Sequence, residues 1–308
     1  MARFTPVEQR IDDAAHRLLA RFPRSRLWSG VLEVLVFGAK QAWACLFGAL
    51  LLIALLAAHF LYPDGAAVAR NDVLTVVAVA LQVIMLLARL ETFGELRVIL
   101  LFHVVGTVME LFKTDVGSWV YASEGILRVG AVPLFTGFMY GAVGSYMVRV
   151  FRLFELRFDR YPRRWIPAVL AAAIYINFFT HHYVVDVRPV LIAGIVALFW
   201  VTSLEAKVFR RTLRIPILAA FAGVAVFIWF AEQIGTGTQT WIYPSQAGEW
   251  HPVSVAKIGS WFLLMMISVA LVTWVYPPLP PAAAPAASTT TGESAAGRAA
   301  AREAAPAA

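Results

Sequence analysis

Two glutamates in apolar stretches of this chain are each followed, at the same distance, by a Trp-x-Tyr motif. The residues of the two motifs are Glu110, Trp119 and Tyr121, and Glu232, Trp241 and Tyr243. A carboxylic acid in apolar surroundings is suited to donating a proton, and the faces of aromatic rings attract the positive charge that such a transfer creates. The glutamates are therefore candidate catalytic residues, and the aromatic residues are candidate substrate-binding residues.

Histidines and an asparagine add further polar groups to the same apolar stretches. His103 precedes Glu110 by seven positions, a spacing that returns to nearly the same face of a helix. Asn177 and His181 share a face by the same reasoning, and His182 follows directly. The pattern permits these groups to converge with the glutamates in one half of a helix bundle. The three histidines are then candidate catalytic residues, and Asn177 is a candidate substrate ligand.

Simpler structural roles compete with each of these assignments. The rings of Trp and Tyr commonly anchor helix ends at a membrane surface, and a single histidine commonly hydrogen-bonds a neighbouring helix. Adjacent histidines point about 100° apart on a helix, unlike metal ligands that share one face. We therefore predict no metal site, and the sequence indicates no particular cofactor.

The composition places these residues in a membrane protein. Of 308 residues, 60% are hydrophobic and 15% are charged, and the mean hydropathy is +0.71; a soluble domain has roughly 25% charged residues. The net charge of +7 comes from short basic clusters between apolar stretches, so it does not indicate a nucleic-acid partner. The expected partner is a membrane lipid or another lipophilic small molecule, and the oligomeric state is open.

Eight stretches are apolar enough, and close enough to the roughly 20 residues that a helix needs, to cross a bilayer. They are residues 41–62, 73–90, 96–112, 131–151, 165–183, 187–204, 215–234 and 253–276. The predicted fold class is therefore all-α, a polytopic bundle of about eight transmembrane helices.

Basic residues are distributed unevenly between the connecting segments. Residues 152–164 and 207–214 are rich in arginine, whereas 63–72 contains one arginine and 235–252 contains no Lys or Arg. Cytoplasmic segments carry the excess of Lys and Arg in membrane proteins. We therefore predict a protein of the bacterial cytoplasmic membrane with both termini in the cytoplasm.

The two ends of the chain differ from the apolar region 41–276. Residues 1–40 are rich in charge and too long for a signal peptide, and within them 8–25 is predicted to form an amphipathic helix, either on the membrane surface or in solvent. Residues 277–308 consist mostly of Ala, Pro, Ser and Thr. Such a sequence cannot bury enough apolar surface to fold, so it predicts a disordered cytoplasmic tail.

The two Glu-Trp-Tyr motifs belong to an internal repeat. They are separated by 122 positions, and Gly137 and Gly259 are separated by the same distance. A fixed period indicates a duplication. The predicted halves are about 41–151 and 165–276, with four helices each. Because an even number of crossings separates them, the two copies should have the same orientation in the membrane.

Several longer stretches resemble the YoaT-like bacterial family of uncharacterised membrane proteins. The stretches are His103–Thr114, Gly117–Tyr121, Val132–Phe135, Asn177–His182 and Glu232–Thr236, within residues 38–276. That family implies no established activity. A shorter pattern, from Glu110 through Trp119 and Tyr121 to Val132-Pro133-Leu134, is similar to carotenoid hydratases and small bacterial lycopene cyclases. This second resemblance implies a membrane enzyme that protonates an alkene of a long polyene with a carboxylic acid.

Two functions fit these observations. In the first, a membrane-embedded enzyme acts on a lipophilic isoprenoid or lipid, and the glutamates and histidines exchange protons with it. In the second, the same residues line a polar path of a transporter or channel for a small solute or ion. The polar residues crowd one half of the predicted bundle, and this favours the enzyme.

Overall fold

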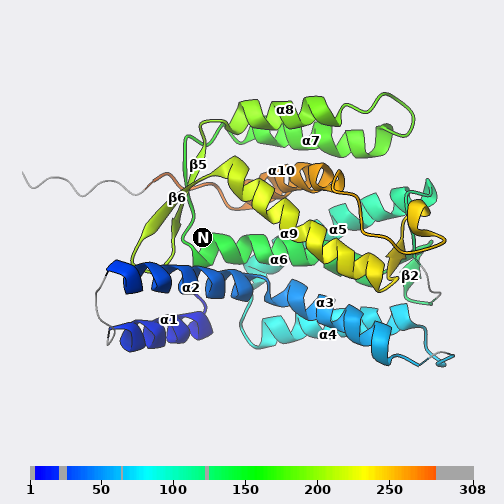
Figure 1. Cartoon of the computed structure of the whole chain (residues 1–308), viewed down its shortest axis with the longest axis horizontal. Coiled ribbons are helices and arrows are strands. Elements are labelled where there is room, and N and C mark those ends of the chain that lie inside the picture. Colours follow the sequence, from blue (N-terminus) through cyan, green and yellow to red (C-terminus); the bar gives the residue numbers. More distant parts are fainter. Residues whose placement is uncertain (1–3, 21–25, 64, 122–124, 282–308) are drawn as a thin grey trace, which may run out of the picture.

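The computed structural model describes residues 4–20, 26–63, 65–121 and 125–281, and α-helices dominate them (Figure 1). The helices are α1 (Pro6–Leu19), α2 (Arg26–Ala44), α3 (Leu46–Leu61), α4 (Arg70–Leu87), α5 (Phe93–Asp115), α6 (Phe135–Leu153), α7 (Trp165–Thr180), α8 (Arg188–Phe199), α9 (Ile217–Gly237) and α10 (Lys257–Val275), with a 3-10 turn at Pro244–Gln246. The strands are β1 (Val120–Tyr121), β2 (Arg128–Val129), β3 (Val132–Pro133), β4 (Arg157–Asp159), β5 (Ser203–Lys207), β6 (Thr212–Pro216) and β7 (Trp241–Ile242). The fold is thus mostly helical, as predicted.

Several helices have the length and composition of membrane spans. Within the described residues, α4, α9 and α10 can each cross a bilayer on these criteria. The pair α2 and α3 is a fourth candidate, bent by 64° at the break between the two helices. Helices α7 and α8 are apolar but shorter, with 16 and 12 residues. The chain is therefore a membrane protein with three or four candidate spans in the part that the structure describes.

The eight predicted spans overlap helices α3 to α10 in order, but the first apolar helix begins earlier than predicted. Helix α2 starts at Arg26, inside the region 1–40 that was predicted to be a cytoplasmic segment. Its outer face is apolar, and Leu27 and Val34 are 76% and 70% exposed. Exposed apolar side chains of this kind are suited to contact with lipid or another protein.

Two charged residues inside α2, after Arg26 at its start, lower its hydropathy and explain the late predicted start. Both are used inside the fold. The Glu33 carboxylate accepts the backbone N–H groups of Phe209 and Arg210, at 3.2 and 2.9 Å. Lys40 donates to the backbone oxygen of Leu153 at 2.7 Å. Because these charges have partners within the protein, an apolar helix can accommodate them.

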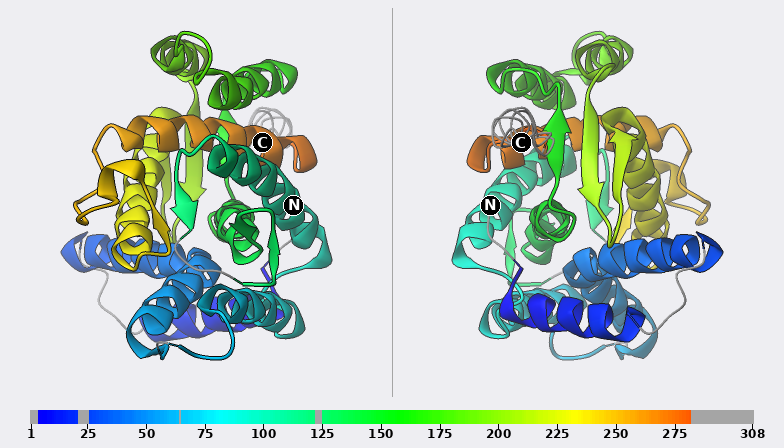
Figure 2. Two further views of the ribbon diagram at one scale, coloured as in Figure 1. Left: turned by 90° about the vertical axis from the view of Figure 1, so that its right-hand side faces the viewer. Right: turned by 90° about the vertical axis from the view of Figure 1, so that its left-hand side faces the viewer.

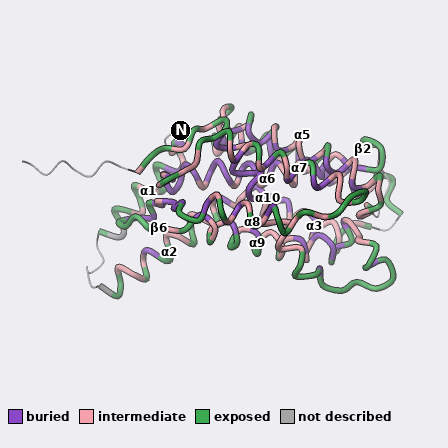
Figure 3. Tube along the Cα trace, turned by 90° about the horizontal axis from the view of Figure 1, so that it is seen from above, coloured by how far each residue is buried: buried purple, intermediate pink, exposed green. Residues whose placement is uncertain are grey.

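Helices α5 and α6 form a central pair, with α10 packed beside them (Figure 2). Glycines permit the close approach of the pair. A Cβ added at Gly106 would lie 2.1 Å from the Tyr140 ring, and one added at Gly144 would lie 3.0 Å from Phe102. Small residues serve this purpose in membrane helix packing. Buried residues are concentrated in the middle of the bundle, along α6 and α10 (Figure 3).

Small antiparallel sheets lie at the two ends of the bundle (Figure 1). At one end, the arginine-rich connecting segments form the three-stranded sheet β4–β5–β6, which the sequence did not predict. At the other end, the two Trp-x-Tyr motifs form the sheet β1–β7, close to the hairpin β2–β3. The arginine-rich connections and the aromatic motifs therefore lie at opposite ends of the molecule.

The amphipathic segment predicted at 8–25 corresponds to α1, although residues 21–25 lie outside the described residues. A buried ion pair fixes α1 to the bundle. The Arg152 guanidinium donates to both oxygens of Glu8, at 2.9 and 2.8 Å, and Trp43 donates to Glu8 at 3.2 Å. The helix is thus docked onto the protein, and neither predicted location, solvent or membrane surface, accounts for its buried face.

The start of the predicted disordered tail is also attached to the fold. The Phe158 N–H donates to the backbone oxygen of Leu279 at 2.8 Å, and Arg157 donates to that of Pro280 at 3.1 Å. Residues 277–280 therefore extend along β4, although they were predicted as part of the tail. Residues 282–308 lie outside the described residues.

The offset of 122 positions between the two motifs recurs between helix boundaries. Helix α5 ends at Asp115 and α9 at Gly237, while α6 begins at Phe135 and α10 at Lys257. Both α6 and α10 contain 19 residues. Equivalent segments of the two predicted halves thus form equivalent elements.

Candidate functional site

The Glu110 carboxylate, near the end of α5, is surrounded by neutral hydrogen-bond donors. The Trp119 indole N–H donates to Oε2 at 2.9 Å, and the Tyr121 hydroxyl donates to the same oxygen at 2.6 Å. Tyr140 of α6 donates its hydroxyl to Oε1 at 2.7 Å. Glu110 is only 3% exposed, so these three donors replace the water that a buried carboxylate loses.

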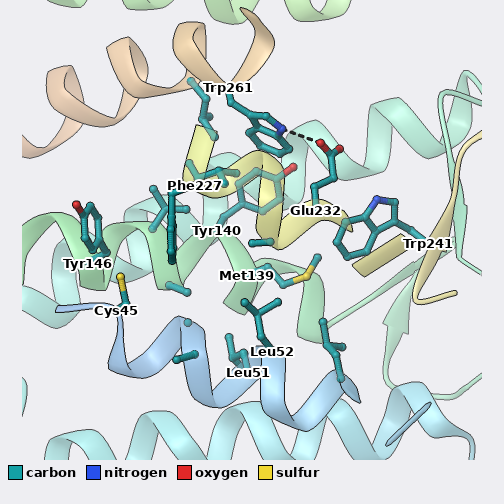
Figure 4. A pocket seen from close by; sticks show the side chains of 18 of the residues that line it. Cys45, Leu51, Leu52, Met139, Tyr140, Tyr146, Phe227, Glu232, Trp241 and Trp261 are labelled. Carbon is teal, nitrogen blue, oxygen red and sulfur yellow. Dashed lines mark hydrogen bonds between the residues drawn. The ribbon is translucent and has the colours of Figure 1, made fainter. Parts of the chain in front are cut away.

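Glu232 occupies the equivalent position in α9 and is 2% exposed. The Tyr243 hydroxyl donates to Oε1, and the Trp261 indole N–H of α10 donates to Oε2 at 2.8 Å (Figure 4). Trp241, the counterpart of Trp119, instead packs over Gly235, where an added Cβ would lie 1.9 Å from the ring. Both carboxylates thus accept from the equivalent tyrosine and from an indole, but the indoles belong to different elements and only Glu110 has a second tyrosine donor.

Strands β1 and β7 hold the two motifs side by side. Tyr121 pairs with Trp241 in the two-stranded ladder. The Trp119 and Tyr243 rings meet edge to face, with their centroids 6.0 Å apart. This pairing brings together two glutamates that are far apart in the sequence.

Both glutamates line one cavity of about 250 Å³, together with residues of α3, α6, α9 and α10. Apolar side chains such as Leu52, Met139 and Phe227 form most of its wall, and Cys45 and Tyr146 lie at the end away from Glu232 (Figure 4). Phe227, one of the lining side chains, is 56% exposed, so the cavity is open beside it.

A lysine that the sequence did not single out stands beside this cavity. The Nζ of Lys257, at the start of α10, lies 4.0 Å from the centre of the Tyr243 ring and 6.0 Å from that of Trp119. These distances are within the range of cation–π attraction. A positive charge of the protein therefore already occupies the faces of two aromatic residues that were predicted to bind substrate.

His103 lies on α5 as predicted but is not among the residues that line the cavity. Its ring meets Phe138 edge to face at 4.8 Å between centroids. It also covers Gly137, where an added Cβ would lie 2.5 Å from the imidazole. These contacts give His103 a role in packing α5 against α6.

Asn177, His181 and His182 form a second polar group, with Lys113 and Ser118, that we call the outer cluster. Lys113 Nζ lies 2.9 Å from Nε2 of His182 and 3.5 Å from Nε2 of His181. None of these five residues lines the cavity. The predicted candidates thus divide into two neighbouring groups, and the expected convergence of histidines and glutamates in one site is not what the structure shows.

The geometry provides no ready metal centre in the part of the chain that the structure describes. No group of three or more His, Cys, Asp or Glu side chains is arranged there to hold a metal ion. The chemistry available to the cavity is that of two carboxyl groups, phenol and indole donors and one lysine.

Sequence reasoning missed Tyr140 and Trp261, which complete the hydrogen bonding of the two glutamates. Each belongs to an apolar helix, where an isolated aromatic residue gives no sign of a polar contact. A signal was nevertheless present, because both follow the repeat-related glycines Gly137 and Gly259 within one helical turn.

A further set of buried polar residues, which we call the inner network, includes Arg149 of α6. Arg149 follows Tyr140 by nine residues, which is about 14 Å along the helix. Glu91 accepts hydrogen bonds from Gln82, at 2.6 Å, and from Ser145. The Arg149 guanidinium is fully buried and lies 5.5 Å from the Trp43 ring, and its nitrogens have no hydrogen-bond partner among the described residues.

A family model described as "Protein of unknown function (DUF817)" matches residues 33–269. The chain belongs to the DUF817 family. The matched range contains both glutamates, the whole cavity lining and the outer cluster, and it omits α1. The uncharacterized protein YoaT of Bacillus subtilis (strain 168) is 37% identical over 242 residues, which cover 79% of this chain and 91% of YoaT. The predicted resemblance to YoaT-like proteins is confirmed, and the resemblance to carotenoid hydratases and lycopene cyclases stays a prediction.

Among solved structures, this DUF817 protein is similar to a mycobacterial Insig homolog, MvINS, from Mycobacterium vanbaalenii. The sequence identity is 16%, and the match covers 61% of this chain and 97% of the homolog, with a TM-score of 0.43.

Proposed function

We propose that this protein is a membrane-embedded enzyme that acts on a lipophilic isoprenoid or lipid by proton transfer from a carboxyl group. The observation that carries the proposal is that Glu110 and Glu232 line the same apolar cavity. Burial of a carboxylic acid in a membrane costs free energy. Two such acids in one cavity therefore favour a functional role over a purely structural one.

The size and position of the cavity support a chain-like substrate. An engineered cavity of about 150 Å³ holds a benzene molecule, so a cavity of about 250 Å³ accommodates only a segment of a long polyene or acyl chain. The exposed face of Phe227 provides a boundary between the cavity and the bilayer. The rest of the substrate would remain among the lipid chains.

The residues around the cavity supply a complete acid–base cycle. One carboxyl group adds its proton to a carbon of an alkene, and the neighbouring carbon becomes a cation. That cation has three outcomes. It loses a proton to the other carboxylate, which isomerises the alkene, or a second alkene of the chain attacks it and closes a ring before the proton is lost to that carboxylate. Alternatively it takes up water, which then releases a proton to the carboxylate. The hydroxyl of Tyr140, hydrogen-bonded to Glu110, and the ring face of Trp241 provide proton exchange and charge stabilisation.

The proposal includes eight transmembrane helices, α3 to α10, in two parallel four-helix repeats. Helices α5 and α6 carry more charge than an ordinary span, but Glu95 of α5 is paired with Arg152 of α6 inside the bundle. Paired and inward-facing charges are tolerated in membranes. The arginine-rich sheet at one end of the bundle (Figure 1) supports a cytoplasmic location for that end. Eight crossings would place the two termini on the same side.

Transport of a small solute or ion is the second candidate, and the inner network favours it. Catalysis at the glutamates does not require the buried Arg149, farther along α6, or the buried Glu91, between α4 and α5. A polar path across the bundle would use such residues. Flux measurements on sealed proteoliposomes separate the two functions, because an enzyme of this kind moves no solute across the membrane.

The test begins with the lipid that copurifies with the protein, extracted and identified by mass spectrometry. We expect a defined lipophilic compound that is lost when Ala142→Phe or Leu52→Trp fills the cavity. Gly223→Ala is the matched control, because nothing lies within 4 Å of a Cβ at that position. Equal retention by all these variants would contradict the binding site.

Proton transfer to carbon is then measured directly by incubating the compound with the protein in heavy water. Deuterium should appear at a carbon of the product. Glu110→Gln keeps the size and hydrogen-bonding capacity of the side chain but removes its proton, and it should stop the incorporation. Glu249→Gln, at an exposed loop position, should not. A product without carbon-bound deuterium would refute the mechanism.

A further inference from the structure

Positive side chains without a carboxylate in ion-pair contact gather beside the cavity. Lys113, Lys257 and Arg188 lie close enough for their charges to repel one another. At longer range, Asp186 attracts the charge of Lys113 and Glu232 attracts that of Lys257. Arg188 forms an ion pair with Asp186 at 2.6 Å. Neither lysine has a carboxylate oxygen within 4 Å among the described residues. The Lys113 side chain belongs to a residue only 6% exposed, so water cannot fully replace a missing counter-ion.

The side chains around Lys113 form a set suited to an anion. Its Nζ lies within hydrogen-bonding distance of both imidazoles, and the Ser118 hydroxyl lies 3.3 Å from Nε2 of His182. His181 holds its Nδ1 2.9 Å from the backbone oxygen of Asn177. This contact places the proton on Nδ1 of the neutral ring, so Nε2 accepts from the lysine. The Lys113 ammonium and the Ser118 hydroxyl can both donate to one phosphate-type group held beside the imidazoles.

The outer cluster is a better anion site than the inner network. In the inner network, the charges of Arg149 and Arg152 are opposed by three buried acids, Glu8, Glu91 and Glu95. An added anion would increase an existing excess of negative charge there. In the outer cluster, Lys113 has no carboxylate oxygen within 4 Å among the described residues, so an added anion there would meet a positive charge that has no ion-pair partner.

The outer cluster adjoins the end of the cavity at which the glutamates lie. Ser118 directly precedes Trp119, and Lys257 lies against the rings of Trp119 and Tyr243, which line the cavity. A molecule held by the outer cluster would therefore have its chain close to Glu110 and Glu232.

We propose that the outer cluster and Lys257 bind a phosphate-type anionic group, the head group of a lipid whose chain enters the cavity. This inference rests on the proposed function and narrows its substrate to an anionic lipid. The carbon that receives the proton would then lie near the head group, because the glutamates and the outer cluster share one end of the cavity.

Head-group selectivity tests the proposal. The purified full-length protein is reconstituted in nanodiscs of mixed phosphatidylglycerol and phosphatidylcholine, and the retained lipid is counted by native mass spectrometry. We expect the wild-type protein to retain phosphatidylglycerol at least tenfold over phosphatidylcholine. Lys113→Gln and Lys257→Gln should each remove this preference. Lys207→Gln, an exposed lysine of β5 that is ion-paired with Glu155, is the control and should keep it.

A second arm identifies the source of the anion. Inorganic phosphate is added to protein in neutral detergent, and the midpoint of thermal unfolding is recorded. An upward shift that Lys113→Gln abolishes, without lipid preference in nanodiscs, supports the anion site and assigns it to a soluble phosphate. Neither lipid preference nor a phosphate-dependent shift in the wild-type protein would overturn the inference. The cavity-filling variants report on the proposed function separately, because they should reduce retention of every lipid and not only of the anionic one.

Discussion

Two buried glutamates in this chain are satisfied by Tyr and Trp donors. Such donors are neutral, so a carboxyl group among them can gain or lose a proton without breaking an ion pair. Their rings also pack as apolar surface, which keeps water away from the acid. Glu110 and Glu232 thus have surroundings suited to the proposed proton exchange with an apolar chain.

The first prediction at this scale is that Glu110 and Glu232 act as one unit. Glu110→Gln or Glu232→Gln alone should abolish turnover while the protein stays folded. The double variant should cost little more than the worse single variant, since residues of one catalytic unit are not additive. Turnover of the copurified lipid and thermal unfolding are the two measurements. Two mild effects that add fully would show that the carboxyl groups act independently.

At the scale of the elements, the hydropathy of the sequence predicted the positions of the apolar helices. The distribution of charged residues did not predict the small sheets at the ends of the bundle. The eight apolar stretches correspond to α3 to α10 because burial in an apolar solvent leaves a long helix as the simplest way to satisfy the backbone. The hairpin β5–β6 was not predicted because its charged side chains, such as Lys207 and Arg214, also indicate a cytoplasmic connecting segment. Their alternation with apolar residues is the pattern of a strand.

The candidate site was predicted in part for the same reason. The Glu-Trp-Tyr motifs were visible because they recur, and the β1–β7 pairing that joins them is a contact between distant segments. Tyr140 and Lys257 occur once, without a counterpart of the same type at the repeat offset. His181 was expected to lie with the glutamates but belongs to the outer cluster. Helical spacing predicts which residues share a face of a helix, but it does not predict which helix packs against that face.

The packing of α5 against α6 provides the second prediction. The methyl group of Gly106→Ala would overlap with the Tyr140 ring and should displace the tyrosine hydroxyl that donates to Glu110. Overpacking of this kind costs about 1–3 kcal/mol. Gly223→Ala, at an open position of α9, should change stability by no more than about 1 kcal/mol. Denaturation in detergent measures both, and equal stability of the two variants would refute the close contact.

The docking of α1 provides the third prediction, which concerns pH. Burial alone would raise the pKa of Glu8, but the hydrogen bond and charge of Arg152 and the backbone N–H of Thr5 lower it overall below 4.5. A carboxyl group with a lowered pKa in the folded state stabilises docking fully above its unfolded pKa. That stabilisation is lost as the pH falls through the folded value.

Hydrogen exchange of the α1 amides measures this docking. Protection should be complete at neutral pH and should fall once the pH drops below 4.5 and passes through the lowered pKa of Glu8. Glu8→Gln should show low protection of the α1 amides at every pH, because the neutral amide cannot form an ion pair with Arg152. Glu155→Gln, an exposed acid paired with Lys207, is the control. Unchanged protection of α1 once the pH has passed below the lowered pKa of Glu8 would contradict the role of the ion pair.

For the whole molecule, the two ends of the bundle differ in the residues that their sheets contain. The fourth prediction follows from this difference. Reporter fusions after residues 66, 185 and 246 should report the extracytoplasmic side, and fusions after 158 and 210 should report the cytoplasm, because arginine-rich segments remain inside. A cytoplasmic signal at 246 or an outside signal at 158 would reverse the orientation or reduce the number of spans.

The register of β1 with β7 has the symmetry of a dimer. Val120 pairs with Ile242, its own counterpart at the repeat offset, and Tyr121 pairs with Trp241, the counterpart of Trp119. A two-fold axis through the first pair would interchange the strands, which is the geometry of an isologous contact between identical subunits. A half-length chain with one Glu-Trp-Tyr motif could therefore form the same strand pair by pairing with a second copy of itself. Fusion of two such chains would then free each half to diverge, and the unequal donors of Glu110 and Glu232 are the kind of difference that this freedom allows.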